Sequence, residues 1–199
     1  AEFVAFEGLI YADFSRDAHV TGEIPGVRNR IIAGVDWGYA NPGGILVGSV
    51  NGDDELDIVT EEYAKQRRVE EWVNVAVQLR DTWNVSIFYC DPSEPEYIAQ
   101  FRKAGLNAVK GDNTVLPGIQ RVQNRLVRQP NGRTRLRINR GCPNLINEAE
   151  QYHWMDNKYG MRDAPVKAND HLLDCLRMMV NALDGTKYTA LTAKGVRYA

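Results

Sequence analysis

The fold of this chain is decided by the stretch IIAGVD at residues 31–36, which is followed by WGY at 37–39. It is a short apolar run with β-branched residues, which predicts a buried strand, and it ends in a carboxylate, Asp36. A second run of the same kind, at 85–90, leads directly into Asp91. Side chains at the carboxyl ends of such strands project from the sheet edge into accessible space. We therefore expect Asp36 and Asp91 to form one site.

The remaining patterns predict an α/β fold with a mixed central sheet flanked by helices. Strand patterns at about 31–36, 44–50 and 56–63 predict an antiparallel three-strand meander, with an Asn51-Gly52 turn between the last two. A helix at 68–83 leads into strand 85–90, so this crossover strand should run parallel to a meander strand. Further elements are expected at 93–103 (helix), 106–109 (strand), 113–128 (helix), 135–138 (exposed strand), 143–152 (helix), 151–161 (hairpin) and 169–183 (helix).

The 199 residues suffice for one domain, which we place at 31–185. A linker segment at 1–30 should pack on it, and a weakly patterned tail should follow at 186–199. The start without methionine fits a domain excised from a longer protein.

Composition narrows the class of protein. The net charge of −2 means that any surface for a polyanion must be local. Three cysteines, an odd number, favour a reducing compartment over a disulfide framework. No apolar run approaches the roughly 18 residues of a membrane span, and no signal-peptide pattern is present. We expect an intracellular protein without a membrane segment.

Two carboxylates at one sheet edge indicate a cation site. Taken singly, Asp36 and Asp91 are ordinary turn residues. As a pair they repel each other unless a cation neutralises them. Mg²⁺ prefers oxygen ligands, and two such ions about 3.5–4 Å apart can activate water and stabilise a leaving oxygen. The pair therefore favours a divalent-metal nuclease.

A third acidic cluster opens the last predicted helix. Asp174 follows Asp170 by four residues and His171 by three, so all three lie on one helix face. The helix dipole alone explains an acid in the first turn, such as Asp170. Asp174 lies near the apolar face and needs a partner there. Which of the three completes the site stays open.

Two other sites are disfavoured by spacing. A zinc site from Cys142, His153, His171 and Cys175 lacks the paired spacing that such sites require. A phosphate-binding P-loop is excluded for this sequence because it has no G-x-x-x-x-G-K-[ST].

Seven arginines gather within twenty residues, with no acid between them. A solvated helix face followed by a charged edge strand would explain some of them. Their density favours a patch that follows DNA phosphates without reading sequence. They are Arg121, Arg125, Arg128, Arg133, Arg135, Arg137 and Arg140.

Together these motifs resemble the nuclease domain of the large subunit of viral DNA-packaging terminases, as in tailed bacteriophages. Residues 8–20 resemble the segment after the ATPase domain of that family, 34–39 its first acidic strand, and 89–92 its second. Residues 170–177 resemble its closing helix. Cys175 and Met178 replace the usual alanine and tyrosine, which are packing positions.

The resemblance implies a ribonuclease H-like fold that cuts double-stranded DNA with Mg²⁺ or Mn²⁺, with two ions expected. It makes Asp36 and Asp91 metal ligands, with an acid or a histidine in third place. It also implies a β-hairpin near the site, for which 151–161 and 133–140 are candidates.

The partners implied are double-stranded DNA, an N-terminal ATPase domain that this sequence lacks, the small terminase subunit and the portal or procapsid. The expected location is the host cytoplasm, and the isolated domain is expected to be a monomer that cuts DNA without translocating it.

The predicted function is therefore a metal-dependent endonuclease that cleaves viral DNA during genome packaging. One alternative is a ribonuclease H-like junction resolvase or transposase-type nuclease, which a preference for branched DNA would reveal. Another is a non-catalytic interaction module of the packaging motor. An actin-like or sugar-kinase ATPase is disfavoured because the chain is too short for two lobes.

Overall fold

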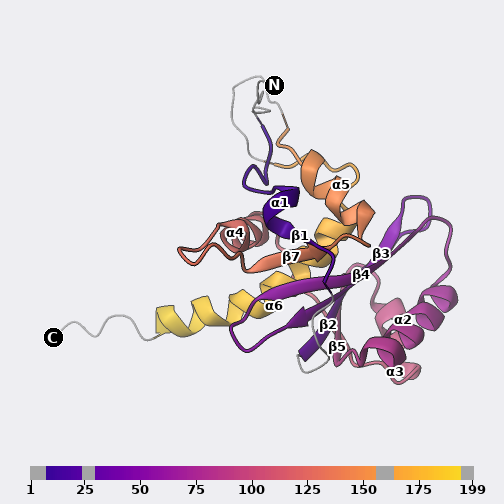
Figure 1. Ribbon diagram of the computed structural model, residues 1–199. Helices are drawn as coiled ribbons and strands as arrows, with labels where there is room; N and C mark the ends of the chain where they lie inside the picture. Colours follow the sequence, from indigo (N-terminus) through magenta and orange to yellow (C-terminus); the bar gives the residue numbers. More distant parts are fainter. Residues whose placement is uncertain (1–7, 24–29, 156–163, 194–199) are drawn as a thin grey trace.

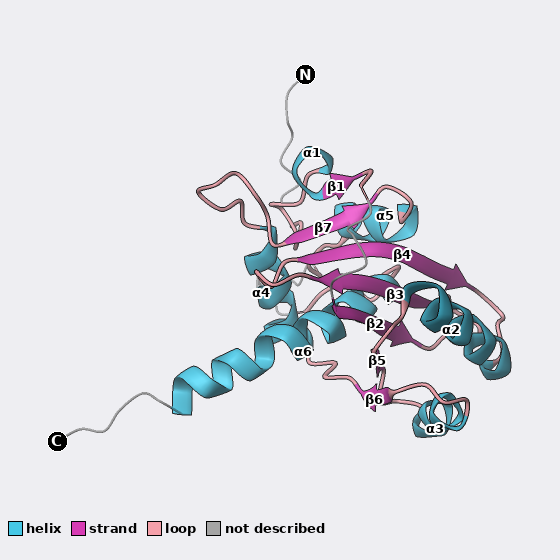
Figure 2. Ribbon diagram, turned by 60° about the horizontal axis from the view of Figure 1, so that its bottom comes forward, coloured by secondary structure: helices cyan, strands magenta, loops and turns pink. Residues whose placement is uncertain are grey.

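The computed structural model describes residues 8–23, 30–155 and 164–193, with side chains described as far as Gly185. Seven strands form one sheet in the order β1-β7-β4-β3-β2-β5-β6 (Figures 1 and 2). The strands are β1 (Val20–Thr21), β2 (Arg30–Asp36), β3 (Gly43–Val50), β4 (Leu56–Ala64), β5 (Ile87–Cys90), β6 (Ala108–Lys110) and β7 (Leu136–Asn139). The helices are α1 (Arg16–His19), α2 (Val69–Trp83), α3 (Pro95–Lys103), α4 (Val115–Leu126), α5 (Pro143–Gln151) and α6 (His171–Ala193).

The predicted meander and crossover are both present. Strands β2, β3 and β4 pair antiparallel, and β5 pairs parallel with β2 and with β6. Helix α2 makes the connection from β4 to β5, as the sequence pattern predicted. The mixed sheet with helices on its faces confirms the ribonuclease H-like fold (Figure 2).

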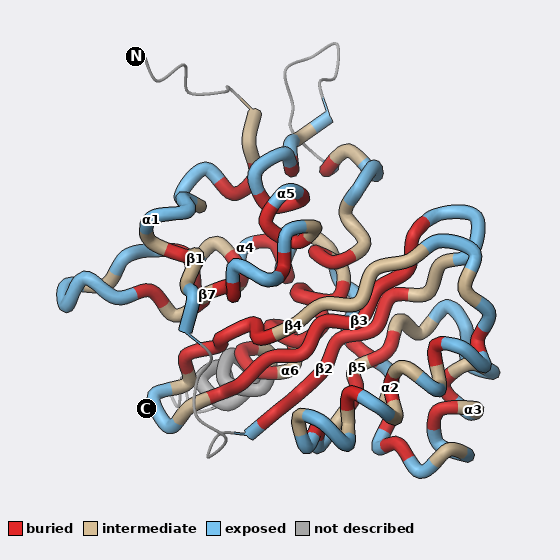
Figure 3. The backbone as a smooth tube through the Cα atoms, turned by 45° about the vertical axis from the view of Figure 1, so that its right-hand side comes forward, coloured by how far each residue is buried: buried red, intermediate tan, exposed pale blue. Residues whose placement is uncertain are grey.

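Helices cover both faces of the sheet, and for that reason β2 is a continuous apolar run. Successive residues of a strand point to opposite faces. Ile32 belongs to a core cluster with residues of α4, α5 and α6. Ala33 and Val35, which point to the opposite face, belong to a second cluster, with residues of α2 and α3. Every residue of β2 after Arg30 is buried (Figure 3), as in strands that are packed on both sides.

Helix α6 approaches β2 so closely that only glycine fits at position 34. A Cβ atom added to Gly34 would lie 2.3 Å from the backbone oxygen of Cys175. We expect Gly34→Ala to lower the free energy of unfolding by about 1–3 kcal/mol, because helix and strand must move apart. Urea denaturation measures this loss. Gly52→Ala is the control, since an added Cβ there meets nothing within 4 Å. Equal losses in the two variants would contradict the packing argument.

The strand predicted at 135–138 is present as β7, but the prediction that it is exposed was wrong. Strand β7 lies between β1 and β4, runs parallel to both, and is largely buried. The N-terminal segment covers it by supplying β1, which no sequence pattern indicated. Because its pairs are parallel, β7 does not form the hairpin considered at 133–140.

The hairpin expected at 151–161 falls mostly on residues 156–163, which lie outside the described residues. In the described part, α5 ends at Gln151, and isolated bridges join Leu9 to His153 and Trp154 to Pro165.

The described part of the N-terminal segment packs on the domain, as expected. Its residues Ile10 and Tyr11 are buried in the core. The side chain of Ser15 accepts a hydrogen bond from Ala18 and caps α1. At the other end, α6 continues to Ala193, into the expected tail (Figure 1). Among the described residues, no helix combines the length and the apolar character that a membrane crossing needs.

Candidate functional site

Asp36 and Asp91 leave neighbouring parallel strands at the same sheet edge. Val35 lies opposite Cys90 in the register of β2 and β5, and each acid is the next residue. The backbone N–H of Asp91 donates to the carbonyl of Val35 at 2.9 Å. Both acids line one cleft of about 790 Å³. The sequence argument that placed the two acids together is consistent with this geometry.

Helix α6 brings the third cluster to the same cleft. The cleft is lined by all five predicted residues, Asp36, Asp91, Asp170, His171 and Asp174. The imidazole N–H at Nδ1 of His171 lies 3.0 Å from Oδ2 of Asp36, to which it donates. Asp174 forms an ion pair with Arg177, one turn further along the helix.

A buried carboxylate from α5 fixes the start of α6. Oε2 of Glu148 accepts hydrogen bonds from the backbone N–H groups of Leu172, at 2.8 Å, and Leu173, at 3.0 Å. These amides have no partner within the helix, so the carboxylate acts as a cap. Burial raises the pKa of Glu148 to about 8. Through its two hydrogen bonds, Glu148 holds the helical turn that carries His171 and Asp174.

The electrostatics of the cleft favour a bound cation. Burial raises the pKa of Asp36; the hydrogen bond from His171 opposes this, and the charges of Asp91 and Asp170 add to it. Burial also raises the pKa of Asp174 to about 7, against the attraction of Arg177. The hydrogen bond to Asp36 raises the pKa of His171. A divalent cation would offset the repulsion between these carboxylates.

The oxygen-rich donor set fits Mg²⁺ or Mn²⁺, but its members now have other partners. In the described part of the chain, no three acidic, histidine or cysteine side chains already form a metal-binding group. The hydroxyl of Ser93 donates to Asp91 at 2.6 Å, and the amide of Asn113 donates to it at 3.3 Å. Metal binding would exchange some of these hydrogen bonds for coordination.

Residues that sequence reasoning missed surround Asp91. Ser93 stands at the start of the helix expected at 93–103, yet α3 starts at Pro95, and Ser93 donates to the carboxylate of Asp91, two residues before it. The local sequence Asp-Pro-Ser indicates such a turn. The indole N–H of Trp37 donates to the carbonyl of Asp91 at 2.9 Å. No local sequence pattern indicates that Asn113 or Glu148 belongs to the site, because both lie on other segments of the chain.

The disfavoured zinc set is not brought together. Cys142 is fully buried in the core, and His153 is exposed next to α5. Cys175 is also buried and donates to the carbonyl of Gly44. Of this set, only His171 lines the cleft.

The phosphate-binding role predicted for Arg125 was wrong. Its side chain has no exposed surface, and its guanidinium donates to both oxygens of Asp184 at 2.8 Å. It also donates to the carbonyl of Asp54 at 2.9 Å. A charge that is buried and paired in this way supports the fold and does not reach DNA.

Most of the other arginines also have acidic or amide partners. Three are held at 2.7–3.0 Å, as the pairs Arg133–Glu55, Arg135–Asp54 and Arg137–Asp57. Arg121 donates to Asn181 at 2.6 Å. Arg128 and Arg140 are exposed, and the nearest acid to Arg128 is Asp17 at 3.8 Å. No acidic residue lies within the arginine run itself; the acidic partners come from β4, from the turn before β4 and from α6. Contact with DNA by the exposed arginines stays a prediction.

Comparison with known proteins gives one sequence relative and several structural ones. No family model matches the chain. The large subunit of the terminase of Escherichia phage T5 is 24% identical over 205 residues, which cover 94% of this chain and 44% of that protein. The large terminase of a thermophilic bacteriophage, solved in complex with ATP-gamma-S, is 28% identical with a TM-score of 0.77. The match covers 90% of this chain and 46% of that one. The chain thus spans about half the length of these relatives.

Separately solved nuclease domains match over nearly their whole length. The P22 large terminase nuclease domain has a TM-score of 0.70 at 16% identity, covering 90% of this chain and 93% of its own. The nuclease domain of the large terminase of bacteriophage SPP1, solved with bound Mn, has a TM-score of 0.64 at 17% identity, covering 91% and 99%. These likenesses show a shared fold. The chain is thus similar in fold to the nuclease domains of phage large terminases and similar in sequence to two full-length large terminases, the family that its motifs resemble.

Proposed function

We propose that this chain is a divalent-metal-dependent endonuclease that cuts double-stranded viral DNA during genome packaging. The observation that carries the proposal is the pair Asp36 and Asp91 on adjacent parallel strands, facing the first turn of α6 across one cleft. The likeness to terminase nuclease domains, one of them solved with bound Mn, supports it.

We assign Asp36 and Asp91 as metal ligands and Asp174 as the third carboxylate. His171 orients Asp36 through its hydrogen bond, and Asp170 adds negative charge at the rim. When bound, Mg²⁺ or Mn²⁺ would lower the pKa of the attacking water and stabilise the leaving oxygen. The side chains hold the ions and, through their shared cleft, define where the phosphate lies.

The proposed partners follow from the relatives. We propose that the domain works with an N-terminal ATPase domain, the small terminase subunit and the portal, in the host cytoplasm. The match to about half of each full-length relative supports the ATPase domain as a neighbour.

Plasmid cleavage tests the proposal. We expect nicking and linearisation in Mg²⁺ or Mn²⁺, none in EDTA, and loss of cleavage in Asp91→Asn. Asp53→Asn is a matched control, because Asp53 is exposed in the β3–β4 turn, away from the cleft. Cleavage in EDTA, or full activity of Asp91→Asn, would refute the assignment. Inactivity in every metal with DNA binding intact would favour the interaction module.

Metal binding should weaken as the pH falls. The pKa of Asp174 is raised to about 7 and that of Asp36 is also raised, so protons compete with the metal below pH 7. We expect the apparent Kd for Mn²⁺ to rise toward tenfold per pH unit below that point. The Mn²⁺-dependent increase in Tm, measured from pH 5 to 8, gives this Kd. In Asp174→Asn the dependence should become shallower, and an unchanged profile would remove Asp174 from the ligand set.

A further inference from the structure

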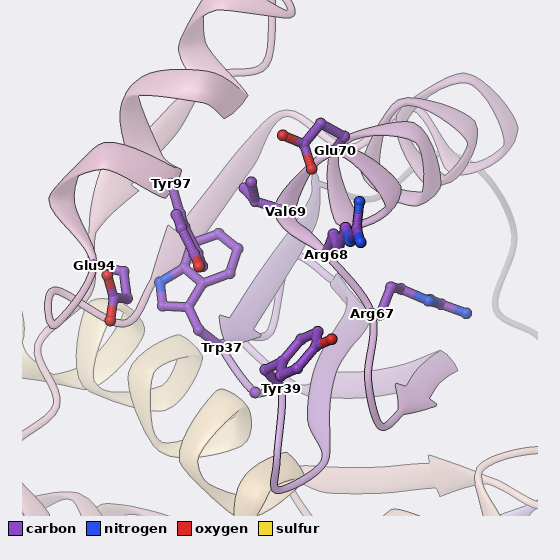
Figure 4. Close-up of a pocket in the computed structure, with 9 residues that line it drawn as sticks. Trp37, Tyr39, Arg67, Arg68, Val69, Glu70, Glu94 and Tyr97 are labelled. Carbon is purple, nitrogen blue, oxygen red and sulfur yellow. The ribbon is translucent and has the colours of Figure 1, made fainter.

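A second hollow adjoins the metal cleft, separated from it by Trp37 and Tyr39, which line both. It has a volume of about 390 Å³. Its walls are three aromatic rings and two cations: Trp37, Tyr39, Tyr97, Arg67 and Arg68, which we call the aromatic shelf (Figure 4). Figure 4 shows Trp37 and Tyr97 on one side of the hollow, with Tyr39, Arg67 and Arg68 on the other.

The aromatic shelf is tied to the loop that carries a proposed metal ligand. The indole of Trp37 donates to the carbonyl of Asp91 at 2.9 Å and meets Tyr97 edge-on, with ring centroids 5.4 Å apart. The carbonyl of Tyr39 accepts a hydrogen bond from the backbone N–H of Gln66 at 2.8 Å. This bond joins the β2–β3 loop to the β4–α2 loop. Anything held on the shelf is therefore positioned relative to the cleft.

Tyr39 presents a ring to solvent that the described residues leave uncovered. The residue is 59% exposed, more than any other large hydrophobic residue described. No aromatic ring of the described chain stacks on it. An exposed aromatic face beside a cation is the arrangement that single-stranded nucleic acid uses, because every base has a face that can stack.

Two cations at the shelf have no acidic partner among the described residues, unlike most of the arginine run. Arg68 lines the hollow and Lys65 lines the adjoining metal cleft; both are exposed, and neither forms an ion pair within the described part of the chain. Arg67 is held in place, 3.3 Å from Glu62 and 4.6 Å over the ring of Trp72. Glu70 and Glu94 also line the hollow, so its surface is not simply basic. The mixed lining fits a nucleotide better than a continuous track of phosphates.

We propose that the aromatic shelf binds one unpaired nucleotide of the DNA strand beside the scissile phosphate. Its base stacks on Tyr39, and its phosphate contacts Arg68 and Lys65. The nucleotide is unpaired because bases within a duplex are stacked on both faces and cannot offer one to the protein. This inference rests on the proposed nuclease function, since it takes the cleft to be the place of cleavage.

Binding measured in EDTA tests the shelf apart from cleavage. Fluorescence anisotropy compares a blunt duplex with the same duplex carrying a short single-stranded tail. We expect the wild type to bind the tailed duplex more tightly, and Tyr39→Ala to weaken that binding about 5- to 100-fold while changing the blunt duplex little. Tyr39→Phe, which keeps the ring, should behave as the wild type.

The contribution of the Arg68 charge to DNA binding is measured separately, from the salt dependence of the affinity. Arg68→Gln should lower the slope of log K against log salt by about 0.7–0.9. Arg30→Gln is the matched control, because Arg30 is an exposed arginine at the start of β2, at the other end of the strand from Asp36, and lines neither hollow, so its slope should not change. Thermal melting in EDTA checks that each variant is folded.

Equal binding of tailed and blunt duplexes by the wild type would overturn the proposal, as would unchanged tailed binding by Tyr39→Ala. Failure of the proposed function looks different. It would appear as absence of metal-dependent plasmid cleavage, whereas failure of the shelf leaves that cleavage intact and removes only the preference for the tail.

Discussion

Asp36→Asn should lower the rate of plasmid cleavage by on the order of 10³-fold or more and leave the chain folded. Asp36 is 7% exposed and is held by His171 at the end of β2. Asparagine has the same shape and can accept the same hydrogen bond, but it brings no charge to a divalent cation. The substitution therefore removes the negative charge of residue 36 and keeps its shape and its hydrogen bond.

The stability of this variant should move in the opposite direction from its activity. The folded-state pKa of Asp36 is raised above its usual value, mainly by burial. Its ionised form therefore costs stability at neutral pH, and that cost grows as the pH rises through the raised pKa. The neutral asparagine avoids it, so we expect Tm in EDTA to be equal to or higher than that of the wild type. Adding Mn²⁺ should raise the Tm of the wild type and not that of Asp36→Asn.

Two observations would contradict this account. One is substantial activity of Asp36→Asn in Mg²⁺ or Mn²⁺. The other is a fall in its Tm in EDTA, which would assign the residue to the fold. Asp53→Asn again serves as the control, since it makes the same chemical change on an exposed turn.

The placement of Asp36 and Asp91 was predictable because it depends on local patterns and one topological rule. Each apolar run indicates a strand, each strand ends in an acid, and the helix between β4 and β5 forces a parallel pair. The placement of His171 and Asp174 in the first turn of α6, with Asp170 immediately before it, followed from helical spacing in the same way. Knowing which residue ends a strand, or which residues share one turn of a helix, is enough to infer that these side chains lie close together.

Contacts between distant segments could not be predicted in this way. Arg125 and its partner Asp184 are 59 residues apart, and nothing near Arg125 in the sequence shows that an acid will meet it. Glu148 caps α6 across 24 residues for the same reason. The pairing of β1 with β7 joins two short segments, neither of which has a distinctive pattern. The arginine run therefore looked like an exposed patch, although its compensating acids lie on other elements.

Arg125→Met should lower the free energy of unfolding by about 3–5 kcal/mol. The variant leaves Asp184, which is 7% exposed, without its two short hydrogen bonds from the guanidinium, so that only the longer contact with Arg135, at 3.5 Å, remains. Methionine fills much of the space but cannot pair with the carboxylate. Urea denaturation at pH 7 measures the loss. Arg128→Gln is the control and should stay within about 0.5 kcal/mol of the wild type, because an exposed pair at 3.8 Å contributes little.

The double variant Arg125→Met/Asp184→Leu separates the loss of the short ion pair from the loss of packing. Removing both members of a buried pair is often nearly neutral, whereas removing one is costly. We expect the double variant to regain most of the stability lost in Arg125→Met, because Arg135 keeps Asp54 as a partner at 3.0 Å. Full recovery is not required, since methionine and leucine need not fill the site as well. A double variant as unstable as Arg125→Met, or less stable, would show that the loss comes from packing, and the role assigned to the ion pair would then be wrong.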